Sequence, residues 1–456
     1  MLTIQVPNNF LPERKYIIDM LFHEFLGLEY DIAVMDTNGF YEITLENTNT
    51  LIVKDHFFGR FREGDDYLDE KEVPSKVKYV ESRFAPGKDI PVIFGSEELK
   101  VEKNKIVCGI DIFASSFFML TRWEEYADKS RDSHGRFPAL ASLAYRNGFL
   151  DRAVVNEYSE MLWNMLRFLK SGQERKKRAF RTFVTHDVDA PFFYANKDLL
   201  IALKRMKYDI FGRNGPVSAL NNFSDWVRVK NGQIERDRYY TFDYIMDVSE
   251  RFSLKSNFLF ITDCSDPARD GDYSFNHKLV RRLLVNIHRR GHDIGLHLSY
   301  GSFKDPSQTQ KEFDILRKVC AEEGIKQDCW TSRHHFLRWA TPASFNNLES
   351  AHLDYDSTLS YADVTGFRCG VCYEYPAFDI IARKQLFLRE RPLLVMECTV
   401  IDERYMNLGA GEKAFGAIKG IKDTCRRFNG DFTVLWHNTR FVDHQERQLY
   451  NQMLQA

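Results

Sequence analysis

The stretch Thr182-Phe-Val-Thr-His-Asp-Val-Asp189 decides how the second part of this chain is interpreted. It begins as a short apolar run of strand-forming residues and ends in side chains that bind metals or transfer protons. A strand that is buried on both faces of a parallel sheet is normally almost purely apolar. Polar residues at the end of such a strand therefore indicate a functional edge of the sheet.

Further short apolar runs follow this stretch and alternate with helical patterns. The runs cover residues 182–187, 256–262, 293–299, 329–337, 355–360, 393–399 and 432–437, and the helical patterns cover 242–252, 277–290, 309–321 and 414–428. Alternating strands and helices predict an α/β fold with a parallel sheet, and this number of strands suits a barrel. Residues 199–238 do not fit a single crossover helix, so we interpret them as an insertion that forms a lid or a rim.

A charged stretch with few apolar residues is typical of a linker between two domains. Such a stretch is Ser171-Gly-Gln-Glu-Arg-Lys-Lys-Arg178. Before it, helical spacing covers 12–28, and strand patterns cover 30–35, 40–45 and 51–53. We therefore predict a smaller α+β domain over residues 1–175 and the larger α/β domain over residues 180–456. The aromatic run 113–126 has two interpretations, which are core packing and a surface that docks on the second domain.

Composition excludes several classes of protein. The chain has 456 residues with 63 Lys and Arg against 65 Asp and Glu, so its net charge is -2 and it lacks the basic excess of a duplex nucleic-acid binder. Its apolar runs are too short to cross a bilayer. We expect a cytoplasmic protein, because the first residues do not resemble a secretory signal and the eight cysteines are sparse and irregularly spaced.

Strand parity selects one set of polar side chains, because alternate residues of a strand share a face. Counting from Asp187, the side chains that point the same way are Asp187, Asp189, His297, Arg333, His335 and His437. The histidines of opposite parity, which we expect to be supporting or exposed residues, are His186, His292 and His334. The selected set combines two carboxylates, three imidazoles and one guanidinium.

This set has two chemical interpretations. Neutral imidazoles and a carboxylate are the usual ligands of a catalytic zinc or similar divalent metal, which keeps one position open for water. A second carboxylate can then take a proton from that water, and a further histidine can return one to the leaving group. The alternative is a metal-free carboxylate pair, which we rank lower because a glycosidase of that type does not need so many histidines.

Five motifs in a fixed order resemble those of a known family. The motifs are Thr185-His-Asp-Val-Asp189, Gly291-His-Asp-Ile-Gly-Leu-His297, Arg333-His-His-Phe336, Tyr355-Asp-Ser-Thr358 and Leu435-Trp-His437. They are similar to the motifs of the polysaccharide deacetylase family, and the whole chain resembles a bacterial subgroup with an N-terminal accessory domain. The resemblance covers about residues 180–440. It implies a distorted (β/α)7 barrel that hydrolyses N- or O-acetyl groups on sugars with a divalent metal.

The resemblance also implies roles for the residues that match. In the family's first motif, Thr-Phe-Asp-Asp-Gly, the first aspartate is the base and the second is a metal ligand. Asp187 matches the base, and the ligand role passes to Asp189, because Val188 lies between them. His297 matches the first of two motif histidines four residues apart, but Gly301 occupies the position of the second. One expected metal ligand is therefore missing.

We expect His335 to supply that missing ligand, since it lies at the end of the next strand. Arg333 matches the arginine that pairs with the base and orients it, and His437 matches the histidine that acts as the acid. Either Glu397 or Asp402, which flank the end of the run 393–399, tunes His437; the sequence does not distinguish them.

Aromatic side chains next to the motifs are candidates for contact with a sugar ring. We predict substrate-binding roles for Tyr300, Trp436 and Phe336, with core packing as the equal alternative for Tyr300 and Trp436. Backbone N–H groups near Phe336 are expected to help stabilise the oxyanion of the tetrahedral intermediate. The pair Cys369 and Cys372 lacks a second pair at zinc-ribbon spacing, so we treat its spacing as coincidence.

These observations predict a metal-dependent hydrolase that acts on an acetylated sugar or a polysaccharide precursor of the cell envelope. Zinc is the first expectation for the metal, with nickel, cobalt and iron as alternatives. Two other functions remain open. The barrel can be a catalytically inactive carbohydrate-binding or assembly module, or it can hydrolyse a non-sugar C–N amide bond, because one fold hosts many chemistries.

Overall fold

The computed structural model describes the whole chain except residues 37–38, 196, 198, 202, 205–206 and 208–214. Contacts within the chain divide it into two compact units. Unit 1 comprises Met1–Arg181, Phe336–Val395 and Gly420–Phe432, and unit 2 comprises Thr182–His335, Met396–Lys419 and Thr433–Ala456. Each unit is therefore assembled from segments that are distant in sequence, whereas two consecutive segments were expected.

The first part of unit 1 is built on a six-stranded mixed sheet in the order β2-β1-β3-β4-β8-β7. Its strands are β1 (Leu2–Pro7), β2 (Tyr30–Met35), β3 (Phe40–Thr44), β4 (Thr50–Lys54), β7 (Gly95–Val101) and β8 (Lys105–Ile110). β1 pairs in parallel with β2 and antiparallel with β3. A separate antiparallel pair joins β5 (Lys78–Glu81) and β6 (Asp89–Val92).

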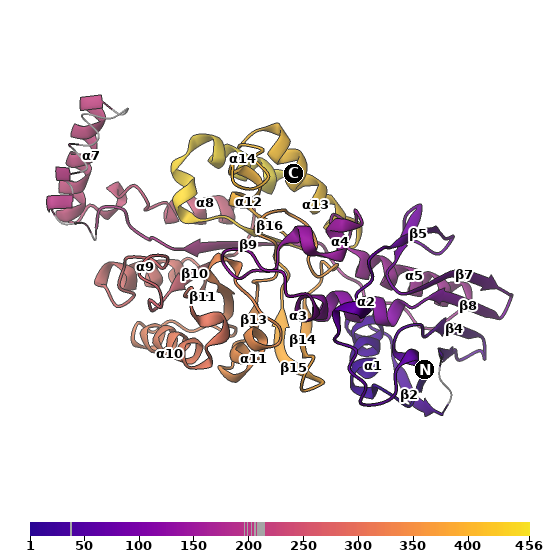
Figure 1. Ribbon diagram of the computed structural model, residues 1–456. Coiled ribbons are helices and arrows are strands. Elements are labelled where there is room, and N and C mark those ends of the chain that lie inside the picture. Colours follow the sequence, from indigo (N-terminus) through magenta and orange to yellow (C-terminus); the bar gives the residue numbers. More distant parts are fainter. Residues whose placement is uncertain (37–38, 196, 198, 202, 205–206, 208–214) are drawn as a thin grey trace. The chain divides into compact units, whose positions relative to one another are not determined.

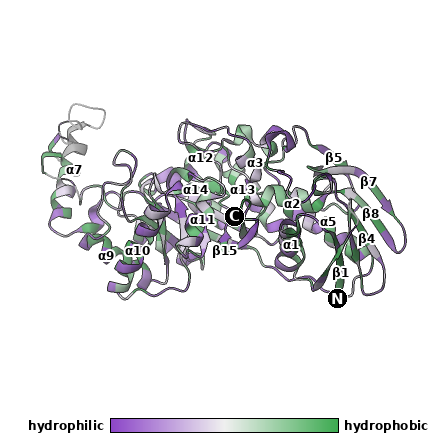
Figure 2. Cartoon of the chain, turned by 60° about the horizontal axis from the view of Figure 1, so that its bottom comes forward, coloured by the Kyte–Doolittle hydropathy of each residue, from purple (hydrophilic) through white to green (hydrophobic). Residues whose placement is uncertain are grey.

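Helices in this part of unit 1 are α1 (Leu11–Ile18), the π-helix η1 (Asp19–Leu26), α2 (Ile112–Thr121), α3 (Trp123–Ala127), α4 (Leu143–Arg146) and α5 (Val154–Phe168). Every residue of α2 is buried, and seven of its ten residues are apolar, as expected for a helix enclosed in a core. Figure 2 shows this hydrophobic colouring along α2. Trp123 is also fully buried, so the aromatic run 113–126 belongs to the core of unit 1.

The later segments of unit 1 contribute α11 (Ala343–Ser350), β13 (Tyr355–Asp356), β14 (Tyr375–Asp379) and β15 (Lys384–Glu390). β14 and β15 form an antiparallel pair, and β13 runs parallel to β15. A buried ionic cluster joins them to α3. Arg368 donates two hydrogen bonds to Glu125, whose Oε1 also accepts from Arg122 at 2.9 Å, and Arg122 donates to the Tyr361 hydroxyl.

Unit 2 has the α/β alternation that the sequence predicts. Its strands β9 (Arg181–Val188), β10 (Ser256–Ile261), β11 (Asp293–Leu298) and β12 (Thr331–His334) are parallel neighbours, and β17 (Asp431–Leu435) lies on the other side of β9. Its helices are α7 (Gly215–Lys230), α8 (Phe242–Arg251), α9 (Lys278–Arg289), α10 (Pro306–Glu322), α12 (Glu397–Ile401) and α14 (His444–Gln455); α13 (Glu412–Arg427) spans a boundary between the units. Figure 1 shows α9 and α10 beside β10 and β11.

Two predicted segments of this region, the run 393–399 and the insertion near residues 199–238, have the following structure. The run 393–399 is mostly not a strand: β16 (Val395–Met396) is two residues long, and α12 begins directly at Glu397. The insertion expected near residues 199–238 falls partly outside the described residues, and its described part includes α7 and the short helix η5 (Ile234–Arg236). Among the helices of the described ranges, none is long and apolar enough to cross a bilayer.

Strand register brings the polar strand ends of unit 2 to one edge of the sheet. His297 on β11 lies opposite Arg333 on β12, and Asp187 on β9 lies opposite Leu259 on β10. All six residues of β10 are buried, and its last four, Phe258–Ile261, are apolar. The polar ends of its two neighbours nevertheless meet, because His297 Nε2 lies 3.6 Å from Asp187 Oδ2. The chain is thus a mixed α/β protein, and in unit 2 the ends of neighbouring parallel strands bring polar side chains together.

Candidate functional site

A buried ion pair lies at the centre of the strand ends in unit 2. Arg333 on β12 donates from Nη1 to Asp187 Oδ1 at 2.7 Å and from Nη2 to Thr185 Oγ1 at 3.0 Å. Both partners of the ion pair are almost completely buried. Burial alone would raise the pKa of Asp187, but the Arg333 guanidinium, followed by His297, outweighs it and lowers that pKa. Asp187 is therefore held ionised and in a fixed orientation.

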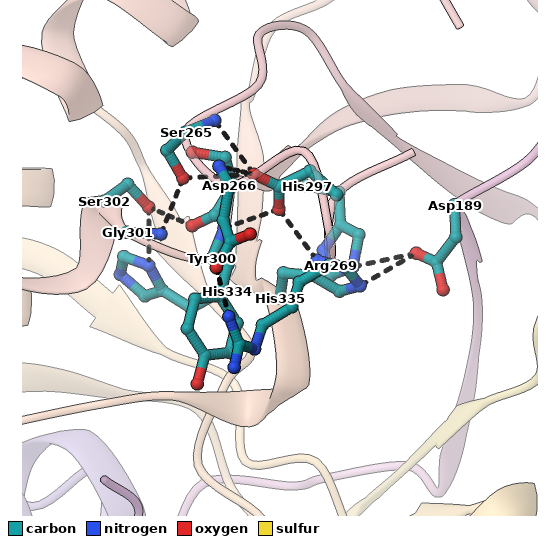
Figure 3. Close-up of polar contacts among 12 residues, drawn as sticks. Asp189, Ser265, Asp266, Arg269, His297, Tyr300, Gly301, Ser302, His334 and His335 are labelled. Atoms are coloured by element: carbon teal, nitrogen blue, oxygen red, sulfur yellow. Dashed lines mark hydrogen bonds and ion pairs between the residues drawn. The ribbon is translucent and has the colours of Figure 1, made fainter. Parts of the chain in front are cut away.

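Three potential metal ligands converge beside this pair. The ligand atoms of Asp189, His297 and His335 all lie within 4.8 Å of one another. Asp189 Oδ1 is 3.3 Å from His297 Nε2 and 3.6 Å from His335 Nε2. Figure 3 shows the Asp189 carboxylate facing the two imidazoles. One carboxylate and two imidazoles with an open side form the ligand set of a catalytic zinc site.

Both imidazoles are held by their far nitrogens. His297 Nδ1 is 2.9 Å from the carbonyl oxygen of Arg333, and His335 Nδ1 is 3.1 Å from Asp270 Oδ1. Hydrogen bonds of this kind fix the tautomer and the ring orientation of histidines that bind metals. The Nε2 atoms of both rings are therefore left to face Asp189.

Asp270 is itself fixed by the backbone. Its carboxylate accepts hydrogen bonds from the N–H groups of Ser265, Asp266 and Tyr300 at 2.7–2.9 Å. Although burial would raise its pKa, the hydrogen bond from His335 and these backbone donors lower it to about 2. Burial would also lower the pKa of His335, but Asp189 and Asp270 together raise it to about 9. Negative charge thus surrounds this imidazole on both sides.

The unsatisfied atoms of this cluster test whether a metal fits. Within the described part of the chain, Asp189 Oδ1 and His297 Nε2 are buried and have no hydrogen bond of acceptable geometry. Buried polar atoms are normally satisfied, and exceptions call for an explanation such as a bound ion. Both atoms point at the same small space and both are good ligands for a divalent metal. The residues present therefore fit such a cation.

A histidine–carboxylate pair completes the site. His437 Nδ1 is 2.5 Å from Glu397 Oε1, and His437 Nε2 is 3.7 Å from Asp189 Oδ2. Burial would lower the pKa of His437, but Glu397 outweighs it and raises that pKa well above its ordinary value. The structure also distinguishes the two carboxylates considered for this role, because Asp402 pairs instead with Arg440 at 2.9 Å.

Gly301, at the position of the second motif histidine, leaves little room for a side chain. Its N–H donates to Ser265 Oγ at 2.7 Å, and a Cβ atom built on Gly301 would meet the same oxygen at 3.0 Å. A histidine at this position would therefore force Ser265 to move. His335 reaches Asp189 from the end of β12 instead, held by Asp270.

Two of the expected substrate-binding residues have other surroundings. Trp436 has no exposed surface, and its ring packs against Phe441 and Tyr450, so it offers no face to a sugar and the core-packing interpretation applies to it. Phe336 belongs to unit 1, where its ring lies 4.8 Å from that of His134.

Tyr300 differs from Trp436, because it is only partly buried and the Arg269 guanidinium lies 4.6 Å from the centre of its ring.

The three histidines of opposite parity are all buried supporting residues. His186 contacts the Trp436 carbonyl oxygen at 2.7 Å, His292 accepts from the N–H of Ser256, and His334 is fully buried.

Sequence reasoning missed Asp270. A signal was available in the acidic loop that follows β10, where Asp263, Asp266 and Asp270 occur after a buried strand end. We made no prediction for this loop because β10 itself carries no polar ligand. Asp270 comes close to His335 only when the loop is folded.

Comparisons with known proteins give the following. A model described as "Family of unknown function (DUF7033)" matches residues 2–171. A search of curated proteins found no match. The chain is similar to the crystal structure of a protein from Mycobacterium smegmatis described as a polysaccharide deacetylase, with 14% identity, 61% of this chain and 84% of that chain covered, and a TM-score of 0.38.

A second similar structure, from Pseudomonas aeruginosa PAO1, is also described as a polysaccharide deacetylase, with 9% identity, the same coverage of 61% and 84%, and a TM-score of 0.37. The structure of Puue Allantoinase, with 9% identity, 61% of this chain and 84% of that chain covered, has a TM-score of 0.36.

Proposed function

We propose that this chain is a metal-dependent hydrolase that removes an acetyl group from an N- or O-acetylated sugar or polysaccharide precursor. The observation that carries the proposal is the convergence of Asp189, His297 and His335 beside the Asp187–Arg333 pair. The motif resemblance supplies the substrate class. The parallel run of strands in unit 2 supports a distorted (β/α)7 barrel over residues 180–456, following an accessory domain over residues 1–175.

Asp189, His297 and His335 would hold the metal, and zinc is the first choice because it favours this mixture of nitrogen and oxygen ligands. When bound, such a cation polarises a carbonyl group and lowers the pKa of a coordinated water to about 7. Nickel, cobalt and iron accept the same ligands. The Nδ1 contacts of the two imidazoles hold the ligand geometry in place before any ion arrives.

The remaining residues divide the proton transfers between them. Asp187, ionised and held by Arg333, takes a proton from the water whose oxygen attacks the acetyl carbon. The C–N or C–O bond then breaks, and His437, protonated and held by Glu397, donates a proton from Nε2 to the leaving amine or alkoxide. The products are acetate and a free amino or hydroxyl group on the sugar. Acid–base assistance of this kind contributes about 10²–10⁴-fold to the rate.

Metal analysis combined with an acetate-release screen tests the proposal. The purified protein should contain one equivalent of a divalent metal, and it should release acetate from at least one N- or O-acetylated sugar in a panel of mono- and oligosaccharides. Removal of the metal with a chelator should abolish release, and zinc should restore it. A protein that binds no divalent metal would instead favour the inactive carbohydrate-binding module.

Asp270→Asn should weaken metal binding without removing a ligand. The amide cannot accept from His335 as a carboxylate does, so the ring loses orientation and basicity. Loss of such a supporting contact typically costs about 10–100-fold in metal affinity. Competition with a chromophoric chelator measures the affinity. Asp266→Asn, in the same loop but without contact to an imidazole, is the control, and equal affinities in both variants would contradict the role of Asp270.

Glu397→Gln should change the pH profile of kcat/KM. Glu397 raises the pKa of His437, so the protonated acid persists to higher pH in the native protein than an ordinary histidine would allow. Without that charge the pKa of His437 falls, and the alkaline limb of the profile should move to lower pH. The acid limb, which reports Asp187, should stay below the ordinary range for aspartate. An unmoved alkaline limb would contradict the assignment of His437 as the acid.

A further inference from the structure

Three donor groups of different chemistry meet at the start of α12, around Nδ1 of His437, whereas Nε2 of the same ring faces Asp189. Glu397 Oε1 lies 2.5 Å from His437 Nδ1 and 3.4 Å from Cys398 Sγ, and Cys398 Sγ lies 4.0 Å from His437 Nδ1. The ligand atoms that the three side chains offer all lie within 4.8 Å of one another. The proton-transfer scheme uses Glu397 and His437 but gives no role to the thiol.

We infer that Glu397, Cys398 and His437 form a second metal site, which takes a thiophilic divalent cation such as Zn²⁺ or Cd²⁺ and inhibits the enzyme. The second metal site does not depend on the proposed function. The inhibition rests on the proposed function, because His437 acts as the acid only in that mechanism.

The distances between the donors suit a tetrahedral ion. Zinc bond lengths of about 2.3 Å to sulfur and about 2.0–2.2 Å to nitrogen or oxygen place neighbouring ligand atoms about 3.3–3.6 Å apart. Two of the three separations are within about 0.5 Å of that range. Only the contact between Glu397 Oε1 and His437 Nδ1 has to open, by about 0.8 Å.

Glu397 has a free atom with which to bind an ion. Its side chain is fully buried, and within the described ranges its Oε2 has no hydrogen-bond partner. A buried carboxylate oxygen without a partner is unusual. Glu397 can therefore contribute Oε2, or both oxygens, while its Oε1 continues to accept from the N–H of His437 at 3.1 Å.

The chemistry of the donors selects the ion. Thiolate and imidazole favour zinc and softer ions over Mg²⁺ or Ca²⁺, which prefer oxygen ligands. Burial, followed by Glu397, raises the pKa of Cys398 to about 11, so the ion has to displace the thiol proton and the Nδ1 proton as it binds. Arg440, whose charge lowers the pKa of Glu397, is already paired with Asp402 and Glu446.

Occupation of this site removes the acid. An ion on Nδ1 replaces the Nδ1 proton and breaks the hydrogen bond between His437 and Glu397. The Nε2 proton stays on the ring, but its loss would now leave an imidazolate, so His437 becomes a much weaker acid. The leaving group then departs unprotonated, and turnover falls. Excess zinc should therefore inhibit an enzyme that needs one zinc ion to work.

Cadmium titration of the metal-loaded protein tests the site itself. Sulfur-to-cadmium charge-transfer absorption reports a thiolate ligand, and elemental analysis counts the ions. Cys398→Ser should bind one equivalent less than the native protein and lose the corresponding part of the absorption, while it keeps the first metal. Cys264→Ser, which alters an exposed free cysteine, is the matched control and should retain the extra site. Equal stoichiometry in Cys398→Ser and the native protein would overturn the inference.

Acetate release under excess zinc tests the inhibition. Cys398→Ser should keep basal activity and need at least about tenfold more zinc for half-inhibition, because it lacks one ligand. Cys398→Ala should behave in the same way, which separates loss of the ligand from any effect of serine. Equal sensitivity in an active Cys398→Ser would refute inhibition through this site. A protein that binds the extra cadmium but releases no acetate would refute the proposed function and leave the second site standing.

Discussion

Asp187→Asn should lower kcat by about 10²–10⁴-fold while the protein keeps its metal. The amide has nearly the same shape as the carboxylate, so Arg333 and the three ligands stay in place. It cannot take a proton from water, so the attack on the acetyl carbon loses its base. Steady-state acetate release gives kcat, and elemental analysis of the same sample gives the metal content.

Two further variants distinguish the base from its neighbours. Asp189→Asn alters a proposed ligand and should lose metal and activity together. Asp272→Asn alters an exposed carboxylate that pairs with Lys197, and it should change neither. If Asp187→Asn turned over at nearly the native rate, the proton would have to go elsewhere and the assignment of the base would be wrong.

Arg368→Met should lower the free energy of unfolding by about 3–5 kcal/mol, because it removes one partner from a buried ionic cluster. Arg368 is fully enclosed in unit 1, where it donates to both carboxylate oxygens of Glu125 and to the carbonyl oxygen of Ser360. Without it, Arg122 is the one charged partner that Glu125 keeps among the residues the structure describes. Urea unfolding followed by circular dichroism measures the change.

Acid should weaken the same cluster. Burial would raise the pKa of Glu125, but Arg368 and Arg122 outweigh it and lower that pKa in the folded state. The stabilisation is therefore present above the pKa of an unfolded glutamate and is lost as the pH falls through the folded value. Arg368→Met should flatten this dependence.

The control is Arg175→Met, which breaks an exposed pair with Glu160 in unit 1 and should cost less than about 1 kcal/mol. Similar losses of unfolding free energy in Arg368→Met and Arg175→Met would show that the buried cluster contributes no more stability than an exposed ion pair.

Strand parity explains how much of the site the sequence revealed. The period of two along a strand placed Asp187, His297 and Arg333 on one side, and the structure brings these side chains together. His335 and His437 lie just beyond their strands, at the first residue of a 3-10 helix and after the end of β17. They meet the site because β12 and β17 end there, one residue before His335 and two residues before His437.

The parts that the sequence did not reveal depend on contacts between distant segments. Asp270 reaches His335 through a loop whose shape comes from backbone hydrogen bonds, and no periodicity predicts that shape. Trp436 lies next to the motif residue His437 in the sequence, but the packing of η8 (Asn438–Val442) and α14 covers its ring. The division into two units likewise depends on which chain segments contact each other, which local patterns do not encode.

Arg333 contacts two neighbours, one through its side chain and the other through its backbone. Its guanidinium holds Asp187, while its carbonyl oxygen holds the His297 ring. A change of side chain at this position alters the first contact and spares the second, because every amino acid has the same carbonyl group. In the proposed hydrolase, a substitution here would therefore remove the partner of the base and leave the support of a metal-binding imidazole intact, so catalysis and metal binding can be lost separately.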